Sequence, residues 1–347
     1  MTDSSFPWLG GNQTQPRGGG FQTEPFAPAA GLANPHVQTL AAIPLARGRG
    51  VRFQRTRLDT PDGDFLDIDV ATVAGADLPA DAPLALLLHG LEGSARRPYA
   101  LEMYRQLARR GIRGVGMNFR SCSGEINRTA RSYHAGATED VALVHAWLDQ
   151  RFPGVAKGMV GFSLGGNMLL KYLGERGGEL AIRLRAAAAV SPPFDLTVGH
   201  ETLNQGLNRR YMASFLGSIQ AKLRAKAELL RPLIDLEAAL AAQTLRELDE
   251  AMTAPVHGFA DAEDYYARVS ARRYLPGIQV PTLVLRAQDD PLISPEDIPH
   301  ELLRLNGALL AVITPNGGHV GWIQGRPPAY RLWAQRQAAA FLAQYLG

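Results

Sequence analysis

The sequence predicts an α/β protein with a mainly parallel, doubly wound central sheet flanked by helices. Short apolar runs, typical of strands buried on both faces, alternate with segments whose apolar residues recur at helical spacing. The 347 residues are 46% hydrophobic, which is enough for a sizeable core and excludes a disordered chain. One long helical stretch interrupts the alternation and indicates an insertion.

The elements are expected in a definite order. Polar and apolar residues alternate over 51–60 and 65–73 around Pro61-Asp62-Gly63-Asp64, which predicts a β-hairpin. Buried strands are then expected at 84–88, 114–119, 159–162, 186–190, 281–285 and 309–313. Helices are expected at 99–110, 138–151, about 164–174 and about 328–345.

Composition divides the chain into an arm and one domain. Residues 1–30 are rich in Gly, Pro, Gln and Thr and are expected to form a flexible or loosely wrapped N-terminal arm. Residues 31–347 are expected to form a single domain, with a helical cap inserted at about 197–275. Packing helices at the sheet edge are the alternative, but insertions in such sheets commonly lie beside the binding crevice.

Charge and cysteine usage narrow the function classes. The net charge is +3 and opposite charges are interleaved, so neither a nucleic-acid groove nor a polybasic membrane anchor is indicated. No apolar run approaches the ~18 residues of a membrane span, and no signal-peptide pattern is present. The single cysteine, Cys122, fits a reducing compartment. A cytoplasmic protein is expected, and the low lysine content with high alanine and arginine suits a bacterial origin.

No cofactor or metal ion is expected. The chain has no Walker A loop and no G-x-G-x-x-G after the first buried strand. His134, Glu139 and Asp140 lack a clear metal-ligand spacing and are interpreted as a solvated helix start. Cys122 is interpreted as a small residue in a packed loop rather than as a nucleophile.

Gly161-Phe162-Ser163-Leu164-Gly165 matches the nucleophile-elbow pattern G-x-S-x-G. In this motif a strand turns sharply into a helix, which strains the serine backbone and projects its hydroxyl. The residues two before and two after must be small, because their side chains would collide across the turn. The expected strand and helix flank the motif here, and an ordinary glycine-rich junction is the alternative.

A serine hydroxyl needs a base to become a nucleophile, and the partners are expected in the order Ser, acid, His. Of eight histidines, only His319 follows the last buried strand in a glycine-rich loop; a hydrogen-bonding loop histidine is the alternative. Asp290 ends the preceding strand and is the preferred acid, with Asp289 as a rival. The acid would orient the imidazole and stabilise the imidazolium.

The developing oxyanion also needs donors. In this architecture they are two backbone N–H groups, one after the nucleophile and one in the loop after an early strand. These are Leu164 and Leu91, the latter within His89-Gly90-Leu91-Glu92-Gly93. We expect His89 to brace that loop rather than to react.

Nine segments from residue 34 onward carry a further pattern. They are 34–40 (NPHVQTL), 89–94 (HGLEGS), 117–125 (MNFRSCSGE), 127–128 (NR), 132–134 (SYH), 136–140 (GATED), 161–167 (GFSLGGN), 254–259 (APVHGF) and 317–321 (GGHVG). Together they resemble the YheT-like esterases of the α/β-hydrolase superfamily, whose eukaryotic relatives include abhydrolase-domain lipid esterases. Ser121 departs from the pattern, in which Gly is expected.

The resemblance implies an α/β-hydrolase fold and a serine hydrolase acting on carboxylic esters. It carries Ser163, Asp290 and His319 over as the catalytic triad, with a small-molecule or lipid-like acyl ester as substrate. An acyltransferase with the same triad remains an alternative, and so does a non-catalytic binding protein on the same fold.

Overall fold

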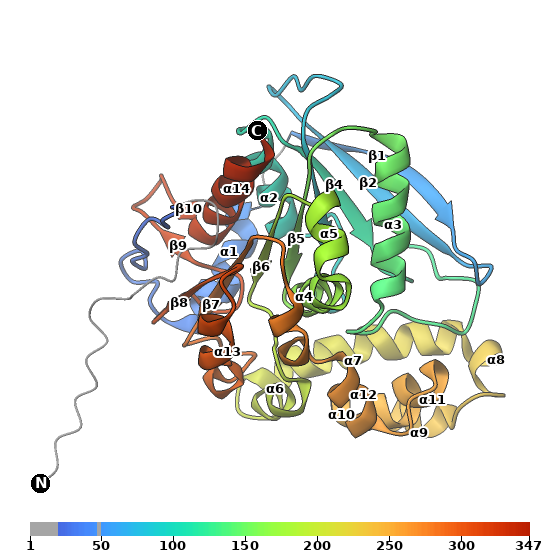
Figure 1. Ribbon diagram of the computed structural model, residues 1–347. Helices are drawn as coiled ribbons and strands as arrows, with labels where there is room; N and C mark the ends of the chain where they lie inside the picture. Colours follow the sequence, from blue (N-terminus) through green and yellow to red (C-terminus); the bar gives the residue numbers. More distant parts are fainter. Residues whose placement is uncertain (1–19, 47–49) are drawn as a thin grey trace, which may run out of the picture.

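The computed structural model describes residues 20–46 and 50–347; residues 1–19, most of the predicted N-terminal arm, lie outside the described residues. The described chain builds an eight-stranded sheet in the order β1-β2-β4-β3-β5-β6-β7-β8 (Figure 1). The six strands β3 to β8 are parallel to one another, and the β1–β2 hairpin adds to β4 in antiparallel orientation. The predicted mainly parallel α/β sheet is therefore confirmed.

The strands lie close to their predicted positions. Their bounds are β1 Val51–Asp59, β2 Phe65–Val73, β3 Leu84–Leu88, β4 Arg113–Asn118, β5 Lys157–Phe162, β6 Ala186–Val190, β7 Thr282–Ala287 and β8 Leu309–Thr314. All residues of β3, β5, β6 and β7 are buried, as expected of strands covered on both faces.

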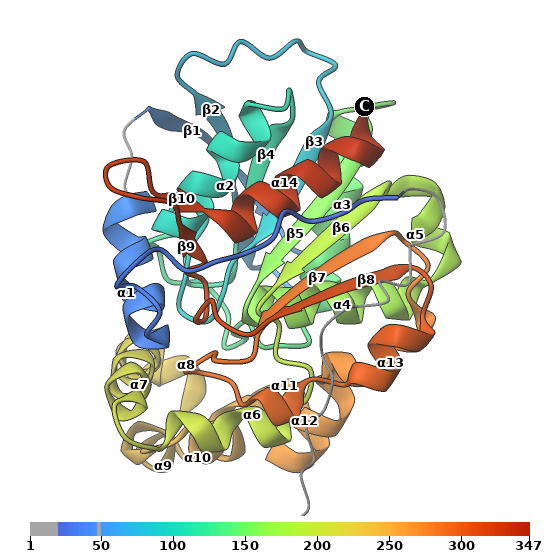
Figure 2. The same cartoon turned by 90° about the vertical axis from the view of Figure 1, so that its left-hand side faces the viewer.

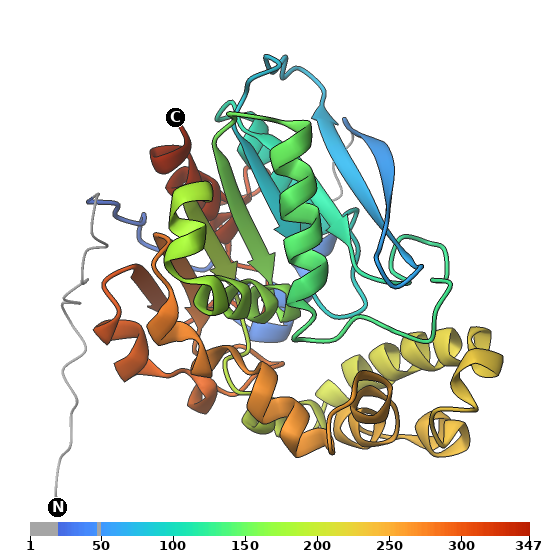
Figure 3. The same ribbon diagram turned by 45° about the vertical axis from the view of Figure 1, so that its right-hand side comes forward.

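Helices cover both faces of the sheet. On one face lie α1 (Pro35–Ala46), α2 (Pro98–Ala108) and α14 (Trp333–Leu346), as Figure 2 shows. On the other lie α3 (Thr138–Arg151), α4 (Leu164–Arg176) and the short α5 (Gly178–Arg183), as Figure 3 shows. Alternate residues of β3 enter the two cores, Leu84, Leu86 and Leu88 on the α4 side and Ala85 and Leu87 on the α14 side.

A series of helices separates β6 from β7. It comprises α6 (Leu196–Leu203), α7 (Asn208–Ala225), α8 (Ala227–Leu230), α9 (Leu236–Ala241), α10 (Leu245–Leu248), the π-helix η1 (Asp249–Thr253), α11 (Ala254–His257), α12 (Ala262–Val269) and the 3-10 turns η2 (Ala271–Arg273) and η3 (Leu275–Gly277). These helices gather at one end of the sheet (Figure 1), and α7, α9 and α10 share an apolar core of their own. None of the described helices is long and apolar enough to cross a membrane.

The C-terminal region differs from the prediction. The last helix begins at Trp333 rather than at about 328, because the preceding residues form a small hairpin of β9 (Ile323–Gln324) and β10 (Arg331–Leu332). Ile323 and Leu332 pair in this hairpin and are buried against α1. The short α13 (His300–Leu305) before β8 was also not predicted.

Residues 20–30, the described part of the predicted arm, run along α14 (Figure 2). The Glu24 carbonyl accepts a hydrogen bond from Trp333 Nε1 at 2.9 Å, and the Glu24 carboxylate lies 3.0 Å from Arg336. The ring of Phe21 packs edge-to-face against Phe341, and the ring of Phe26 packs at a tilt against Trp333. This segment therefore covers apolar surface of the C-terminal helix.

The start of α3 is not solvated as predicted. Asp140 is buried and forms a two-pronged ion pair with buried Arg120, with both N···O distances at 2.8 Å. Arg120 also contacts Asp62 at 2.8 Å and Asp64 at 3.2 Å, and His134 is buried as well. Only Glu139 is exposed. The buried guanidinium balances three carboxylates, which the linear spacing alone does not reveal.

The surroundings of Ser121 show how a serine can occupy the position where the family pattern has glycine. Its φ is +61°, in the left-handed region where glycine is favoured. The Ser121 hydroxyl accepts a hydrogen bond from the Asn127 backbone N–H at 3.1 Å, and the Ser121 N–H donates to the Asn127 side chain. These bonds hold a non-glycine residue in that conformation.

The Arg120 cluster gives a stability prediction. Arg120→Met should destabilise the fold by about 3–5 kcal/mol, because it leaves buried carboxylates without their counter-charge. The measurement is urea unfolding followed by circular dichroism. Arg128→Met is the matched control: its exposed pair with Asp59 should contribute about 1 kcal/mol or less. Equal losses in the two variants would contradict the assignment.

Candidate active site

Ser163 occupies the sharp turn between β5 and α4. Its φ of +53° and ψ of −124° are strained for a serine, as the elbow pattern predicts. A Cβ at Gly161 would collide with the backbone of Gly165, and one at Gly165 would collide with the backbone of Leu88 and His89. The two glycines are therefore required for the turn.

The structure brings the three predicted residues into one hydrogen-bonded line. His319 Nε2 lies 2.8 Å from Ser163 Oγ, and His319 Nδ1 lies 2.8 Å from Asp290 Oδ2. Ser163, His319 and Asp290 follow β5, β8 and β7, so all three lie at the carboxyl end of the parallel strands.

Asp290 is completely buried and held on both oxygens. Oδ2 pairs with the buried Arg286 guanidinium as well as with His319, and Oδ1 accepts from Leu292 N at 2.9 Å and Ile293 N at 3.3 Å. Burial alone would raise the pKa of Asp290, but His319 and Arg286 hold it below its ordinary value. The carboxylate facing the imidazole is therefore charged.

Asp289 forms hydrogen bonds with the loop that carries His319 and not with the imidazole ring. Its Oδ1 accepts a hydrogen bond from Gly318 N at 3.0 Å, and its Oδ2 lies 3.3 Å from Asn316 Nδ2. Burial raises its pKa above the ordinary value, although these bonds oppose that shift. The geometry thus pairs His319 with Asp290, and the rival aspartate holds the loop that presents His319.

Helix α1 also positions His319, a contribution that the motifs did not reveal. The His319 N–H donates to Thr39 Oγ1 at 3.0 Å, and the Ser191 hydroxyl donates to the His319 carbonyl. A Cβ at Gly318, whose φ is +64°, would lie 2.6 Å from the Pro35 carbonyl. The segment 34–40, noted only as a resemblance, is therefore the support of the histidine loop.

The loop after β3 lies directly against Ser163. A Cβ at Gly90 would be 3.1 Å from Ser163 Cβ, so glycine is what allows the approach. His89 braces the loop as predicted: its Nε2 accepts from Phe119 N at 3.1 Å and its Nδ1 donates to the Gly90 carbonyl at 2.8 Å. Burial lowers the pKa of His89 to about 3, so the ring is neutral.

Leu91 and Leu164, the predicted oxyanion donors, flank the serine and both line the cavity that contains it. Within the described part of the chain, neither backbone N–H donates to a protein acceptor. Both donors are therefore free for a ligand.

Glu92 connects this loop to helix α7 and was missed in the sequence. Its φ is +51°, and its buried carboxylate lies 2.7 Å from Tyr133 Oη and 2.8 Å from Lys222 Nζ, with a further bond from Ser218 Oγ. Two of these three partners belong to α7. The HGLEG segment gave no signal of this ion pair, because Lys222 is far away in sequence.

Ser163 and His319 line a cavity of about 490 Å³, within the usual range for small-molecule sites. Its wall is mostly apolar and comes from α1, α6, α7, α10 and the loop after β7; the large side chains include Ile43, Leu203, Tyr211, Phe215, Leu245 and Ile293. The insertion therefore supplies part of the wall around the serine.

Cys122 is not an alternative nucleophile. Its thiol is buried and lies 3.3 Å from Lys222 Nζ, and burial raises its pKa to about 11.

Among the residues described, no group of three or more His, Cys, Asp or Glu side chains is arranged to hold a metal ion.

Comparison with known proteins agrees with the fold. Residues 83–325 match the family model described as alpha/beta hydrolase fold, so the chain belongs to the α/β-hydrolase family. It is 38% identical over 330 residues to "Putative esterase YheT" of Escherichia coli (strain K12), covering 92% of this chain and 94% of that protein. The predicted family resemblance is confirmed, and these findings identify a hydrolase.

More distant relatives extend the comparison. Phospholipase ABHD3 of Mus musculus is 29% identical over 324 residues, covering 92% of this chain and 78% of that protein. The solved structure of the Pyrococcus furiosus esterase Pf2001 superposes with a TM-score of 0.54 at 18% identity, over 85% of this chain and 94% of that one. At that identity the likeness shows the fold alone.

Substitution of the two aspartates should affect kcat to very different extents. Asp290→Asn should lower kcat for a p-nitrophenyl ester by about 10⁴-fold, because an amide does not stabilise the imidazolium and favours the wrong tautomer. Asp289→Asn should lose less than about tenfold, because an amide oxygen still accepts from Gly318. Thermal melts should show both variants folded. A larger kcat loss in Asp289→Asn would reverse the assignment.

Proposed function

We propose that this protein is a carboxylic ester hydrolase that works through an acyl-enzyme on Ser163. The observation that carries the proposal is the line of two 2.8 Å contacts from Ser163 Oγ through His319 to Asp290, at the wall of an apolar cavity. The membership in a family with esterase relatives supports it.

The first half of the reaction forms the acyl-enzyme. His319 Nε2 accepts the Ser163 proton while Oγ attacks the ester carbonyl carbon, and Asp290 stabilises the resulting imidazolium. The N–H groups of Leu91 and Leu164 donate to the oxyanion. As the tetrahedral intermediate collapses, the bond to the alkoxy oxygen breaks and His319 gives its proton to the leaving alcohol.

The second half uses water by the same route. His319 removes a proton from water, the hydroxide attacks the acyl carbon, and the Ser163 oxygen leaves with the proton of His319. The products are a carboxylic acid and the free enzyme. The residues of the chain supply every proton transfer, so the proposal calls for neither a metal ion nor an organic cofactor.

The substrate class follows from the cavity wall. Leucine, isoleucine and aromatic side chains favour a small or lipid-like acyl ester, and the name of the phospholipase relative agrees with an acyl ester of lipid type. We assign the inserted helices as a cap, because α6, α7 and α10 face Ser163 across this cavity. The cap would select the ester and limit the access of water.

The nucleophile is tested by a fluorophosphonate probe and an ester panel. Wild-type protein should be labelled, and Ser163→Ala should lose the label and at least about 10³-fold in kcat/KM. Cys122→Ala is the control and should retain both, because the buried thiol takes no part. Labelling of Ser163→Ala at the wild-type level would overturn the proposal.

Hydrolysis and acyl transfer are separated in the same assay. Adding a short alcohol at millimolar concentration should leave the free acid as the main product. Predominant formation of the new ester would identify an acyltransferase with the same nucleophile.

A further inference from the structure

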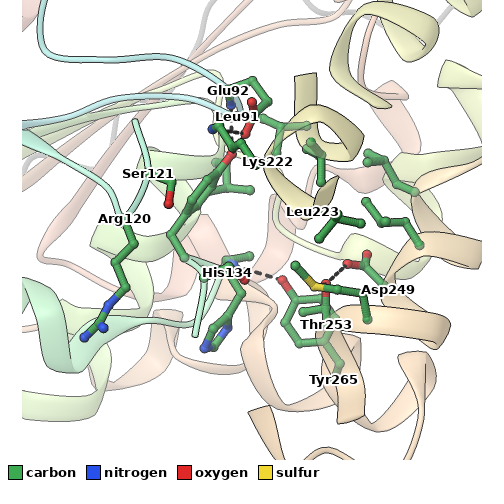
Figure 4. A pocket seen from close by; sticks show the side chains of 18 of the residues that line it. Leu91, Glu92, Arg120, Ser121, His134, Lys222, Leu223, Asp249, Thr253 and Tyr265 are labelled. Carbon is green, nitrogen blue, oxygen red and sulfur yellow. Dashed lines mark hydrogen bonds and ion pairs between the residues drawn. The ribbon is translucent and has the colours of Figure 1, made fainter. Parts of the chain in front are cut away.

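A second cavity lies between the core and the inserted helices (Figure 4). It shares part of its wall with the serine cavity. Its volume is about 100 Å³. Five side chains line both cavities and thus form the partition between them: Leu91, Glu92, Leu164, Leu196 and Leu245. Four of the five are leucines, whose side chains can rotate aside without breaking hydrogen bonds.

The second cavity is lined mainly by apolar side chains. Beyond the partition, the apolar lining consists of Ala130, Ala135, Ile219, Leu223, Leu230, Leu248 and Met252. Figure 4 shows Leu223 of α7 on one side of the space and Tyr265 of α12 on another. A cavity of this kind holds hydrocarbon more readily than water: an apolar cavity of ~150 Å³ stays dry and binds benzene.

The polar groups in the wall are already bonded within the protein. Asp249 accepts from Thr253 Oγ1 at 2.6 Å and from Tyr266 Oη at 2.9 Å. Lys222 pairs with Glu92, as shown above, and Lys226 donates to the Arg131 carbonyl at 2.7 Å. A bound molecule therefore does not need to supply hydrogen bonds to these groups. The polar groups of a sugar or a nucleotide would lack partners here, which disfavours both as ligands.

The position relative to the triad indicates which part of an ester would enter. The leaving alcohol takes its proton from His319, so it must lie on the His319 side of the serine. Among described residues, the lining of the second cavity includes Leu91 and Leu164 but neither His319 nor Val320, which line the serine cavity. The second cavity thus lies away from His319, which favours the acyl part of an ester over the alcohol as its occupant.

We propose that the second cavity binds the distal methylene groups of an aliphatic acyl chain whose carbonyl is attacked by Ser163. The inference rests on the proposed function and narrows its substrate to esters of acids too long for the serine cavity alone. The chain passes between Leu91, Leu164 and Leu245, and the small volume of the cavity sets an upper limit to its length.

The upper limit on acyl length can be measured as a break in the dependence of kcat/KM on the length of the acyl chain. Burying one methylene group should raise kcat/KM about three- to fourfold, by the usual apolar transfer energy, until the cavity is full. Beyond that length the rise should stop or reverse. The assay uses p-nitrophenyl esters from acetyl to hexadecanoyl below their micelle concentrations.

Two variants should move the break in opposite directions. Ala130→Leu adds bulk to the second cavity only and should lower kcat/KM at least tenfold for the longest preferred ester while sparing the acetyl ester. Met252→Ala opens space and should shift the optimum to longer acids. Ala213→Leu is the matched control, because it makes the same change on an exposed position of α7 outside both cavities.

Two results would overturn the inference. The first is an unchanged acyl profile in folded Ala130→Leu and Met252→Ala. The second is a change, in these variants, only in the profile for acetate esters of alcohols of increasing length. That result would place the alcohol, not the acyl chain, in the second cavity. The wild-type rate with the acetyl ester and the labelling of Ser163 test ester hydrolysis independently of the second cavity. A failure of the proposed function can therefore be distinguished from a failure of the acyl-chain proposal.

Discussion

The buried ion pair between Arg286 and Asp290 is the interaction on which the rest of the site depends. Both side chains are completely buried, where an isolated charge would be strongly unfavourable. Each charge compensates the other, and Arg286 also donates to the Ile293 carbonyl at 2.9 Å. The pair therefore fixes the loop after β7 and keeps Asp290 ionised where it meets His319. Burial alone would raise the pKa of this carboxyl, and His319 and Arg286 oppose that rise.

The histidine depends on contacts from regions far apart in sequence. Its ring is held by Asp290, its N–H by Thr39 of α1 and its carbonyl by Ser191 after β6. Its neighbour Gly318 is held by Asp289. The loop is thus fixed by hydrogen bonds along its backbone as well as through the ring, which limits the loss of conformational freedom when substrate binds. Such a support explains why an irregular, glycine-rich loop can place a catalytic base accurately.

The sequence permitted prediction of those features that are encoded locally. Strands β3, β5 and β6 were predicted because a short apolar run is a sufficient signal, and Ser163 because the elbow needs glycine at 161 and 165. The order of strands then indicated His319 and Asp290. Features that depend on tertiary contact were missed: the β9–β10 hairpin, the Arg120 cluster and Glu92. Each needs partners separated by a turn or by many residues, and no spacing rule identifies them.

Glu92 joins the loop after β3 to the inserted helix α7. It follows Leu91, a predicted oxyanion donor, and its carboxylate is held by Ser218 and Lys222 of the inserted helix α7. The same residue stands in the partition between the two cavities. A displacement of α7 would therefore change the backbone beside Ser163 as well as the space for an acyl chain. Because one ion pair links both effects, chain-length selection and oxyanion geometry are expected to be coupled in this protein rather than independent.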